Sequence, residues 1–283
     1  MTAHPRVSMG GGEAGDQPYD PSMVAHLSKA TAAELAQLPP WATLVRAPNP
    51  GPMTLDGTNT WVLRAPGAGS AVLVDPGPDD EAHLAAAAGY APIGLILVTH
   101  GHPDHTDGLA RLNDLLGGVP VVAAAAPTLD GRAAGALREA GLELVTLPTP
   151  GHTADSVSFH VQVGADEVVL TGDTILGRGS AVVAWPDGDL GDYLASLDRL
   201  AGLGPIPVLP GHGPALTDCA AAARAYLRHR LARLDQVRAA RAAGAADVDE
   251  VVAAVYADVD SALRPAARWS VAAQLAYLER DPS

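Results

Sequence analysis

The sequence of 283 residues lacks the features that define several classes of protein. It contains one cysteine, Cys219, which excludes an intramolecular disulfide and a zinc site built from cysteines alone. No apolar run approaches the roughly 20 residues that a membrane-spanning helix needs, so we expect neither an integral membrane protein nor a membrane partner. Only 4% of the residues are aromatic, so alanine, valine and leucine must fill the core.

Basic residues are also scarce: 18 Lys and Arg stand against 32 Asp and Glu, which gives a formal net charge of −14. This balance argues against a protein that coats nucleic acid through bulk charge, and no duplex DNA partner is expected. The hydrophobic share of 48% and the charged share of 18% are typical of a globular protein. The length accommodates one large domain, alone or with a small appendage.

Residues 1–22 are rich in glycine, proline and small polar residues. They lack the basic start, the apolar middle and the small-residue cleavage site of a secretory signal. We therefore expect a disordered leader, a cytoplasmic location and a reduced Cys219. A short helix is expected over 23–38, where Ser28 and Thr31 can cap it.

From about residue 42 the chain alternates between short apolar runs and helical segments, which predicts an α/β fold with helices covering the sheets. The run Ser156–Val163 instead alternates, and predicts a strand with Ser158, His160 and Gln162 on a solvent-exposed face. The expected strands are 60–63, 71–74, 93–98, 119–122, 142–147, 157–163, 167–170 and 206–209. The expected helices between them are 79–88, 106–116, 128–140 and 190–202.

Past residue 217 the strand pattern stops and three helices are expected. Gly244 ends the first helix, Asp247 with Glu250 resembles a capping box that opens the second, and Pro265 opens the third. These helices cover 218–243, 247–257 and 265–277. The predicted organisation is a leader at 1–22, a domain at 23–217 and a C-terminal helical subdomain at 218–283.

One segment, Thr99–His105, concentrates metal-binding side chains directly after the expected strand 93–98. Neutral imidazole and carboxylate groups are suitable ligands for zinc. A single histidine is more often an ordinary surface or core residue, but four such side chains on one loop favour a metal site. They are His100, His102, Asp104 and His105.

Three later loops each place one further ligand-type residue beside a glycine at the end of an expected strand. His152 follows strand 142–147, Asp173 follows 167–170, and His212 follows 206–209. Each of these alone is typical of an ordinary turn. Together with the first segment they reinforce the metal site.

The order of these residues resembles the metallo-β-lactamase superfamily of binuclear metallohydrolases. The match is the motif His-x-His-x-Asp-His at 100–105, followed by the three later ligands, and it covers about residues 42–217. The resemblance implies an αββα sandwich and two zinc ions, with manganese or iron as alternatives. It implies that His100, His102 and His152 hold one metal, that Asp104, His105 and His212 hold the second, and that Asp173 bridges them.

Asp75, in Val74-Asp75-Pro76-Gly77, matches the first motif of that family. The resemblance implies that it orients the metal ligands from behind. The alternative is a turn-forming Asp-Pro-Gly after a strand. The histidines outside the motifs are expected on the surface: His4, His26, His83, His160 and His229.

Within the superfamily, the chain is most similar to the β-lactamase-like protein 2 group. The resemblance rests on Asn49–Thr60, Gly172–Gly179, Asp192–Leu194, Tyr226–Arg230 and the helical tail, which is winged-helix-like in that group. Members include single-strand-selective endoribonucleases and thioesterase-like enzymes of polyketide pathways. Few residues follow the third helix of this sequence, so we expect little or no β-wing.

The resemblance also narrows the chemistry. The true β-lactamases of the family carry Cys or Ser at the bridging position, so Asp173 argues against antibiotic hydrolysis. The two metals would generate a bridging hydroxide, with Asp104 and Asp173 as the catalytic carboxylates and Asp104 orienting the nucleophile. Three functions remain open: an endoribonuclease-like phosphodiesterase acting on single-stranded RNA, a thioester hydrolase of the glyoxalase II or acyl thioesterase type, and a metal-binding protein without catalysis. We favour the first.

The expected helix 218–243 is rich in arginine, with six between 224 and 241 and one acid, Asp235. We favour a solvated face with Leu227, Leu231 and Leu234 packed inward. The alternative is a surface that follows RNA phosphates, because the arginine fork suits phosphate oxygens.

Overall fold

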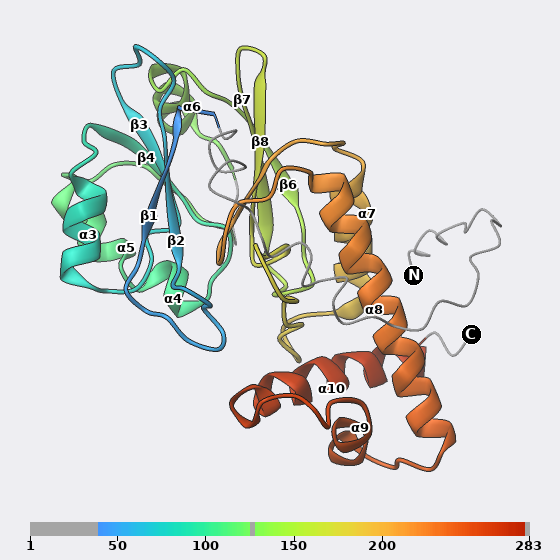
Figure 1. Ribbon diagram of the computed structural model, residues 1–283. Coiled ribbons are helices and arrows are strands. Elements are labelled where there is room, and N and C mark those ends of the chain that lie inside the picture. The colour runs from blue at the N-terminus through green and yellow to red at the C-terminus, as the bar shows by residue number, and fades with distance from the viewer. Residues whose placement is uncertain (1–38, 125–127, 281–283) are drawn as a thin grey trace.

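The computed structural model describes residues 39–124 and 128–280, which form two β-sheets covered by helices and a helical C-terminal part (Figure 1). The expected leader 1–22 and the expected helix 23–38 lie outside the described residues. No helix of the described part is long and apolar enough to cross a bilayer. The expected α/β class and αββα arrangement are confirmed.

The first sheet has the order β1–β2–β3–β4–β5. The pairs β1–β2 and β2–β3 are antiparallel, whereas β3–β4 and β4–β5 are parallel. The sequence pattern did not predict β1, because its residues are half-buried without alternation. The strands are β1 (Ala42–Arg46), β2 (Asn59–Leu63), β3 (Ala71–Val74), β4 (Ile93–Leu97) and β5 (Val121–Val122).

The second sheet has the order β6–β7–β8–β9, with two antiparallel pairs and a parallel pair at β8–β9. Ser158 on β7 is buried and its hydroxyl lies 2.9 Å from that of Thr149, so the expected solvent-exposed face is wrong at this position. The strands are β6 (Glu143–Pro148), β7 (Val157–Val163), β8 (Asp166–Gly172) and β9 (Val208–Pro210).

The core lies between the sheets. Trp61 and Leu63 of β2 face Phe159 of β7 and its neighbours, whereas Val62 points to the helices outside. Both faces of the central strands are buried, so these strands read as continuous apolar runs in the sequence. The covering helices are α3 (Glu81–Ala88) and α5 (Leu109–Leu115) on the first sheet, and α7 (Leu190–Ala201) on the second.

Two helical predictions need correction. The expected helix 106–116 corresponds to α5, which begins at Leu109; a separate short helix, α4 (Pro103–Thr106), ends before Gly108. A Cβ at Gly108 would lie 2.8 Å from the Pro78 carbonyl oxygen, so the chain turns here where only glycine fits. The helix α6 (Gly131–Glu139) begins three residues later than expected and contacts β3, β4 and β6.

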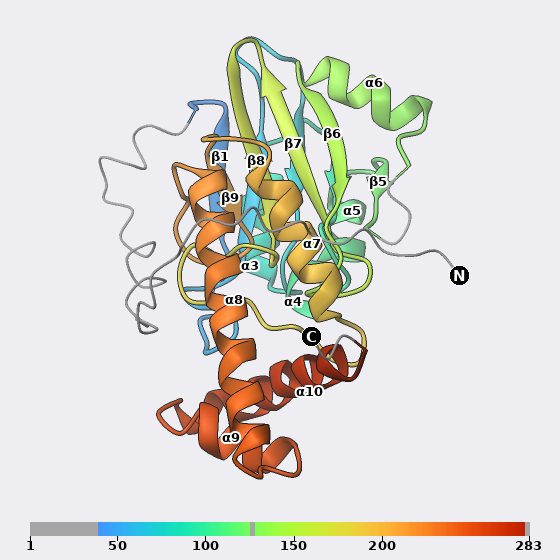
Figure 2. The same ribbon diagram turned by 90° about the vertical axis from the view of Figure 1, so that its right-hand side faces the viewer.

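The long helix α8 (Cys219–Ala242) joins the sandwich to the C-terminal part (Figure 2). Its first half packs against α7, while Val237 in its second half packs with α9 (Val248–Val255) and α10 (Arg264–Arg280). Half of the expected capping box is present at α9, because the Asp247 carboxylate accepts from the Glu250 amide at 2.9 Å, whereas the Glu250 carboxylate accepts from the Ala246 amide at 2.6 Å. Within the described residues no strand follows β9. The domain boundary at 217/218 stays a prediction.

Two further burial predictions are wrong. His83 is 3% exposed rather than on the surface, because its Nε2 lies between the Thr60 hydroxyl and the Pro76 carbonyl, at 2.9 and 3.1 Å. Leu231 of α8 is 36% exposed rather than packed inward, whereas Arg230 beside it is buried.

We predict that Phe159→Ala lowers the free energy of unfolding by about 3–5 kcal/mol, because it empties a fully buried site between the sheets. Val145→Ala on neighbouring β6 is the control, since Val145 is 56% exposed and its truncation should change stability by less than about 0.5 kcal/mol. Urea unfolding followed by circular dichroism measures both. Similar losses in the two variants would contradict this location of the core.

Candidate metal centre

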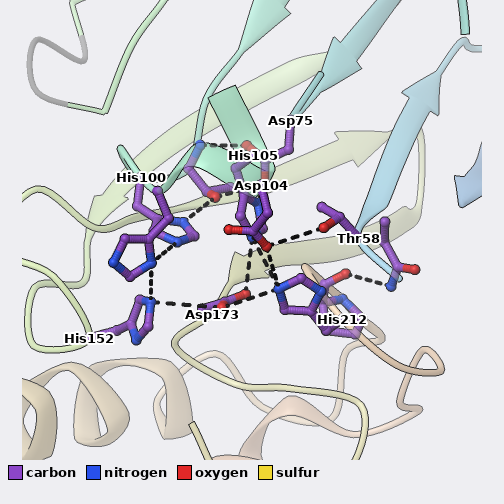
Figure 3. A network of polar contacts seen from close by, with 12 residues as sticks. Thr58, Asp75, His100, Asp104, His105, His152, Asp173 and His212 are labelled. Carbon is purple, nitrogen blue, oxygen red and sulfur yellow. Dashed lines mark hydrogen bonds and ion pairs between the residues drawn. The ribbon is translucent and has the colours of Figure 1, made fainter. Parts of the chain in front are cut away.

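All seven expected ligands converge at one edge of the sandwich, beyond the ends of β4, β6, β8 and β9 (Figure 3). The short helix α4 carries Asp104 and His105 back toward the strand end that precedes His100. There are three groups of residues whose ligand atoms lie within 4.8 Å of one another inside each group. They are His100, His102 and His152; His100, His105 and Asp173; and Asp104, His105 and His212.

The first cluster consists of His100, His102 and His152. Nδ1 of His102 lies 3.1 Å from Nε2 of His100 and 3.0 Å from Nε2 of His152. Tetrahedral zinc with bonds of about 2.0–2.1 Å to nitrogen places its ligands about 3.3 Å apart. The spacing of these three nitrogens therefore fits a zinc ion.

The second cluster consists of Asp104, His105 and His212. Nε2 of His212 lies 3.3 Å from Nε2 of His105 and 3.2 Å from Oδ2 of Asp104. The third separation, between His105 Nε2 and Asp104 Oδ2, is 3.5 Å. This mixed nitrogen and oxygen set has the same tetrahedral spacing.

Asp173 lies between the two clusters. Its Oδ2 is 3.7 Å from Nε2 of His152 in the first and 3.4 Å from Nε2 of His212 in the second. Its Oδ1 is buried and accepts no hydrogen bond in the described part of the chain. A buried carboxylate oxygen without a donor is costly, so this atom fits a metal ligand.

Hydrogen bonds behind the rings direct the ligand nitrogens of both clusters. Nδ1 of His105 lies 2.9 Å from Oδ2 of Asp75, and Nδ1 of His152 lies 2.6 Å from the Val182 carbonyl. Carboxylates and carbonyls only accept, so each Nδ1 carries the proton when its imidazole is neutral. Each Nε2 then presents a lone pair to the centre.

Asp75 joins three groups through one carboxylate. It accepts from the Thr99 amide at 2.8 Å and from the Thr99 hydroxyl at 2.7 Å, besides His105. Its backbone has φ of 55°, a left-handed conformation that aspartate tolerates better than most residues. This geometry supports the orienting role that the family resemblance implies.

The two clusters differ in their electrostatics. Burial lowers the pKa of His152 and, together with the neighbouring His105, that of His100, so both rings are held neutral. Burial also opposes protonation of His212, but Asp173 and Asp104 raise its pKa to about 9. Conversely, His212 and His105 hold the pKa of Asp173 well below its usual range despite burial. The second cluster therefore attracts positive charge strongly.

Three supporting residues were not predicted from the sequence. The Thr99 hydroxyl lies 3.1 Å from Nδ1 of His100, and the Thr58 hydroxyl donates to Oδ2 of Asp104 at 3.2 Å. Asn59 donates through Nδ2 to the carbonyls of Pro210 and Gly213, on either side of His212. Thr58 and Asn59 lie in the segment Asn49–Thr60, whose resemblance to the β-lactamase-like protein 2 group was the sequence signal that could have identified them.

Glycine at 211 keeps the centre open. A Cβ there would lie 2.6 Å from Oδ1 of Asp173 and 2.7 Å from Cε1 of His105. Any side chain at this position would displace both ligands, so the Gly211-His212 pair is a steric requirement of the site.

The fold and the ligand set agree with the comparisons. Residues 53–212 match the metallo-β-lactamase superfamily, and residues 248–281 match the β-lactamase-associated winged helix domain. The chain therefore belongs to the metallo-β-lactamase superfamily, whose members are generally metal-dependent hydrolases.

Individual relatives are consistent with this membership. The chain is 31% identical over 257 residues to the β-lactamase-like protein 2 homolog of Caenorhabditis elegans, covering 84% of each. It is 33% identical over 223 residues to the lactamase-like protein vrtG of Penicillium aethiopicum, covering 72% of this chain and 66% of that protein. A metallo-β-lactamase family protein from Thermus thermophilus has the same fold, with a TM-score of 0.67 at 24% identity over 86% of this chain and 95% of that one.

We predict two bound zinc ions per chain, because two three-ligand clusters share Asp173. Asp173→Ala should lower the number of bound ions, measured by elemental analysis after zinc reconstitution and dialysis. Asp166→Ala is the control, since Asp166 is exposed at the other end of β8. One ion or fewer in the unmodified protein would contradict a binuclear centre.

Proposed function

We propose that this protein is a binuclear zinc-dependent hydrolase of ester-type bonds, with single-stranded RNA as the first candidate substrate. The observation that carries the proposal is the position of Asp173 between two complete three-ligand clusters. Two metals that share one carboxylate suit attack on a carbonyl or phosphoryl centre. A metal-binding protein without catalysis has the least support, because all seven ligand side chains are present and converge.

Bound zinc would activate a water molecule at neutral pH and polarise the bond under attack. The protein's own residues hold and direct the site. The Asp104 side chain is 28% exposed and that of Asp173 is 11% exposed, so Asp104 lies nearer the solvent from which a substrate arrives. Thr58 and His212 fix the Asp104 carboxylate through Oδ2, which keeps it oriented.

The helical tail, which matches the β-lactamase-associated winged helix domain, favours RNA as a substrate. The described residues contain no strand after β9 and therefore no β-wing, and the arginines of α8 favour RNA less than their number implies. Arg230 is buried, Arg233 donates to the Val255 carbonyl, and Arg241 donates to the carbonyls after α8. Arg224 and Arg228 are the exposed arginines that remain for phosphate contacts in the first half of the helix.

An acyl thioester is the second candidate, favoured by the charge of the sandwich. Residues 39–217 contain 19 acidic residues against 7 arginines, which repels a polyanion from the catalytic domain. A small thioester does not meet this repulsion. Its thiolate also departs without a general acid, so it needs no proton donor beside the two clusters.

We predict no efficient turnover of β-lactams, because the shared position holds Asp173 rather than a thiol or hydroxyl. A chromogenic cephalosporin with the zinc-loaded protein provides the measurement. A dedicated zinc β-lactamase assayed alongside shows that the assay detects turnover. Rapid hydrolysis by this protein would mean that the role given to Asp173 is wrong.

The two candidate substrates predict different effects of salt and of α8. If RNA is the substrate, the double variant Arg224→Ala with Arg228→Ala should weaken RNA binding. It should also flatten the logarithmic dependence of binding on salt by about 0.7 for each phosphate that an arginine no longer neutralises. The control removes two exposed arginines from the sandwich, Arg111→Ala with Arg132→Ala, and changes the net charge equally.

Cleavage of a small aryl phosphodiester should be the same in both double variants, because the metal centre is untouched. Equal RNA cleavage by the unmodified protein and the α8 variant would refute a role of α8 in RNA binding. If the protein hydrolyses acyl thioesters at a rate that does not depend on salt and does not cleave RNA, the thioester is the substrate and RNA is not.

A further inference from the structure

Arg230 presents a buried guanidinium in the middle of α8. It is 3% exposed, although a guanidinium that loses its hydration is normally paired with a carboxylate. Within residues 39–124 and 128–280 no carboxylate forms an ion pair with it. Its Nη2 donates to the Ala181 carbonyl, and its Cζ lies 5.1 Å from the ring centroid of Tyr193. Burying an unpaired guanidinium costs free energy, so we expect its hydrogen bond to the Ala181 carbonyl to have a role.

The acceptor of that hydrogen bond, Ala181, directly precedes Val182, whose carbonyl contacts the expected metal ligand His152. The next carbonyl, of Val182, accepts from Nδ1 of His152 at 2.6 Å. The amide of Ala184 donates to the His152 carbonyl at 3.0 Å. Ala181 is 3% exposed and Val183 is 1% exposed, so the residues on both sides of Val182 are buried. Arg230 therefore holds the loop on one side while His152 contacts it on the other.

Two tyrosines next to this guanidinium hold the segment after Asp173 in a similar way. The Tyr193 hydroxyl donates to the Thr174 carbonyl at 2.7 Å. The Tyr226 hydroxyl lies 3.1 Å from the Leu176 amide, which donates to it. Both tyrosines are buried, and they come from α7 and α8. The inner faces of these helices thus support two of the loops that carry ligands.

We propose that Arg230 is a positioning residue for the metal centre: it holds the loop 181–183 so that the Val182 carbonyl fixes the ring of His152. His152 then presents Nε2 to the first cluster and carries its proton on Nδ1. The effect on metal binding rests on the proposed function, whereas the effect on the His152 ring rests on the contacts alone. The helix that leads into the winged helix domain thereby becomes part of the metal site's support.

The ring of His152 can be observed directly by nuclear magnetic resonance on metal-free protein. Protected imidazole Nδ1 protons are expected from His152 on Val182 and from His105 on Asp75, besides those that His100 and His212 direct at the Thr99 hydroxyl and the Gly57 carbonyl. His152→Asn and His105→Asn assign the first two. Arg230→Met should shift or remove the His152 signal and leave the His105 signal in place.

The matched control is Arg238→Met on the same helix, which removes an arginine paired at the surface with Asp235. It should leave both proton signals unchanged. An unchanged His152 signal in Arg230→Met, or equal changes in both signals, would overturn the proposal. If Arg230→Met does not fold, judged by near-ultraviolet circular dichroism, Arg230→Lys is tested by the same criterion.

Zinc titration against a competing chelator gives a second readout. Arg230→Met should weaken the binding of one of the two zinc ions about 10–100-fold, which is the usual effect of losing a supporting partner. Asp75→Asn should weaken the second-cluster ion most, because Asp75 contacts His105 directly and reaches the first cluster only through Thr99 and His100. Equal weakening of both ions by Arg230→Met, or none, would contradict the proposal. A protein that binds no zinc refutes the proposed function, while the proton signals still decide the role of Arg230.

Discussion

The carboxylate of Asp75 is the interaction on which the metal centre depends. It lies at the end of β3 and binds both the amide and the hydroxyl of Thr99 at the end of β4. The same group accepts from His105, which returns on the short helix α4. One side chain therefore fixes the spacing of two parallel strand ends and the direction of a ligand. Since Thr99 also contacts His100, ligands of both clusters depend on it.

The second constraint is that each metal cluster takes ligands from both sheets. The two sheets must therefore be held in a defined position relative to each other at the edge where the ligands meet. Apolar side chains between the sheets supply burial but little direction, because such contacts are not directional. Hydrogen bonds from β2 supply the missing direction. Asn59 and Trp61 both donate to the Pro210 carbonyl, each at 3.0 Å, and so connect the first sheet to the loop that carries His212. This connection places His212 against Asp104 and His105 in the second cluster.

The sequence predicts this molecule best where one local rule decides the outcome. The strands with two buried faces, the helix cap at Asp247 and the convergence of seven ligands at strand ends all follow from residue type and spacing. The sequence predicts burial poorly where the position of a side chain depends on a partner that is distant in the chain. Ser158 and His83 look like surface residues until Thr149 and Thr60 satisfy them inside the fold. The arginines of α8 look alike in sequence, yet Tyr193 and the Ala181 carbonyl draw one of them inside.

The continuity of α8 has a consequence for how the protein unfolds. Cys219, Ala222 and Tyr226 complete the layer outside the second sheet, and Val237, about three turns further on, belongs to the C-terminal core. A helix propagates order along its length, so fraying at one end is coupled to loss of packing at the other. The sandwich and the winged helix domain should then open as one cooperative unit. A truncation placed before Cys219 would remove part of the sandwich's own hydrophobic layer together with the appended domain.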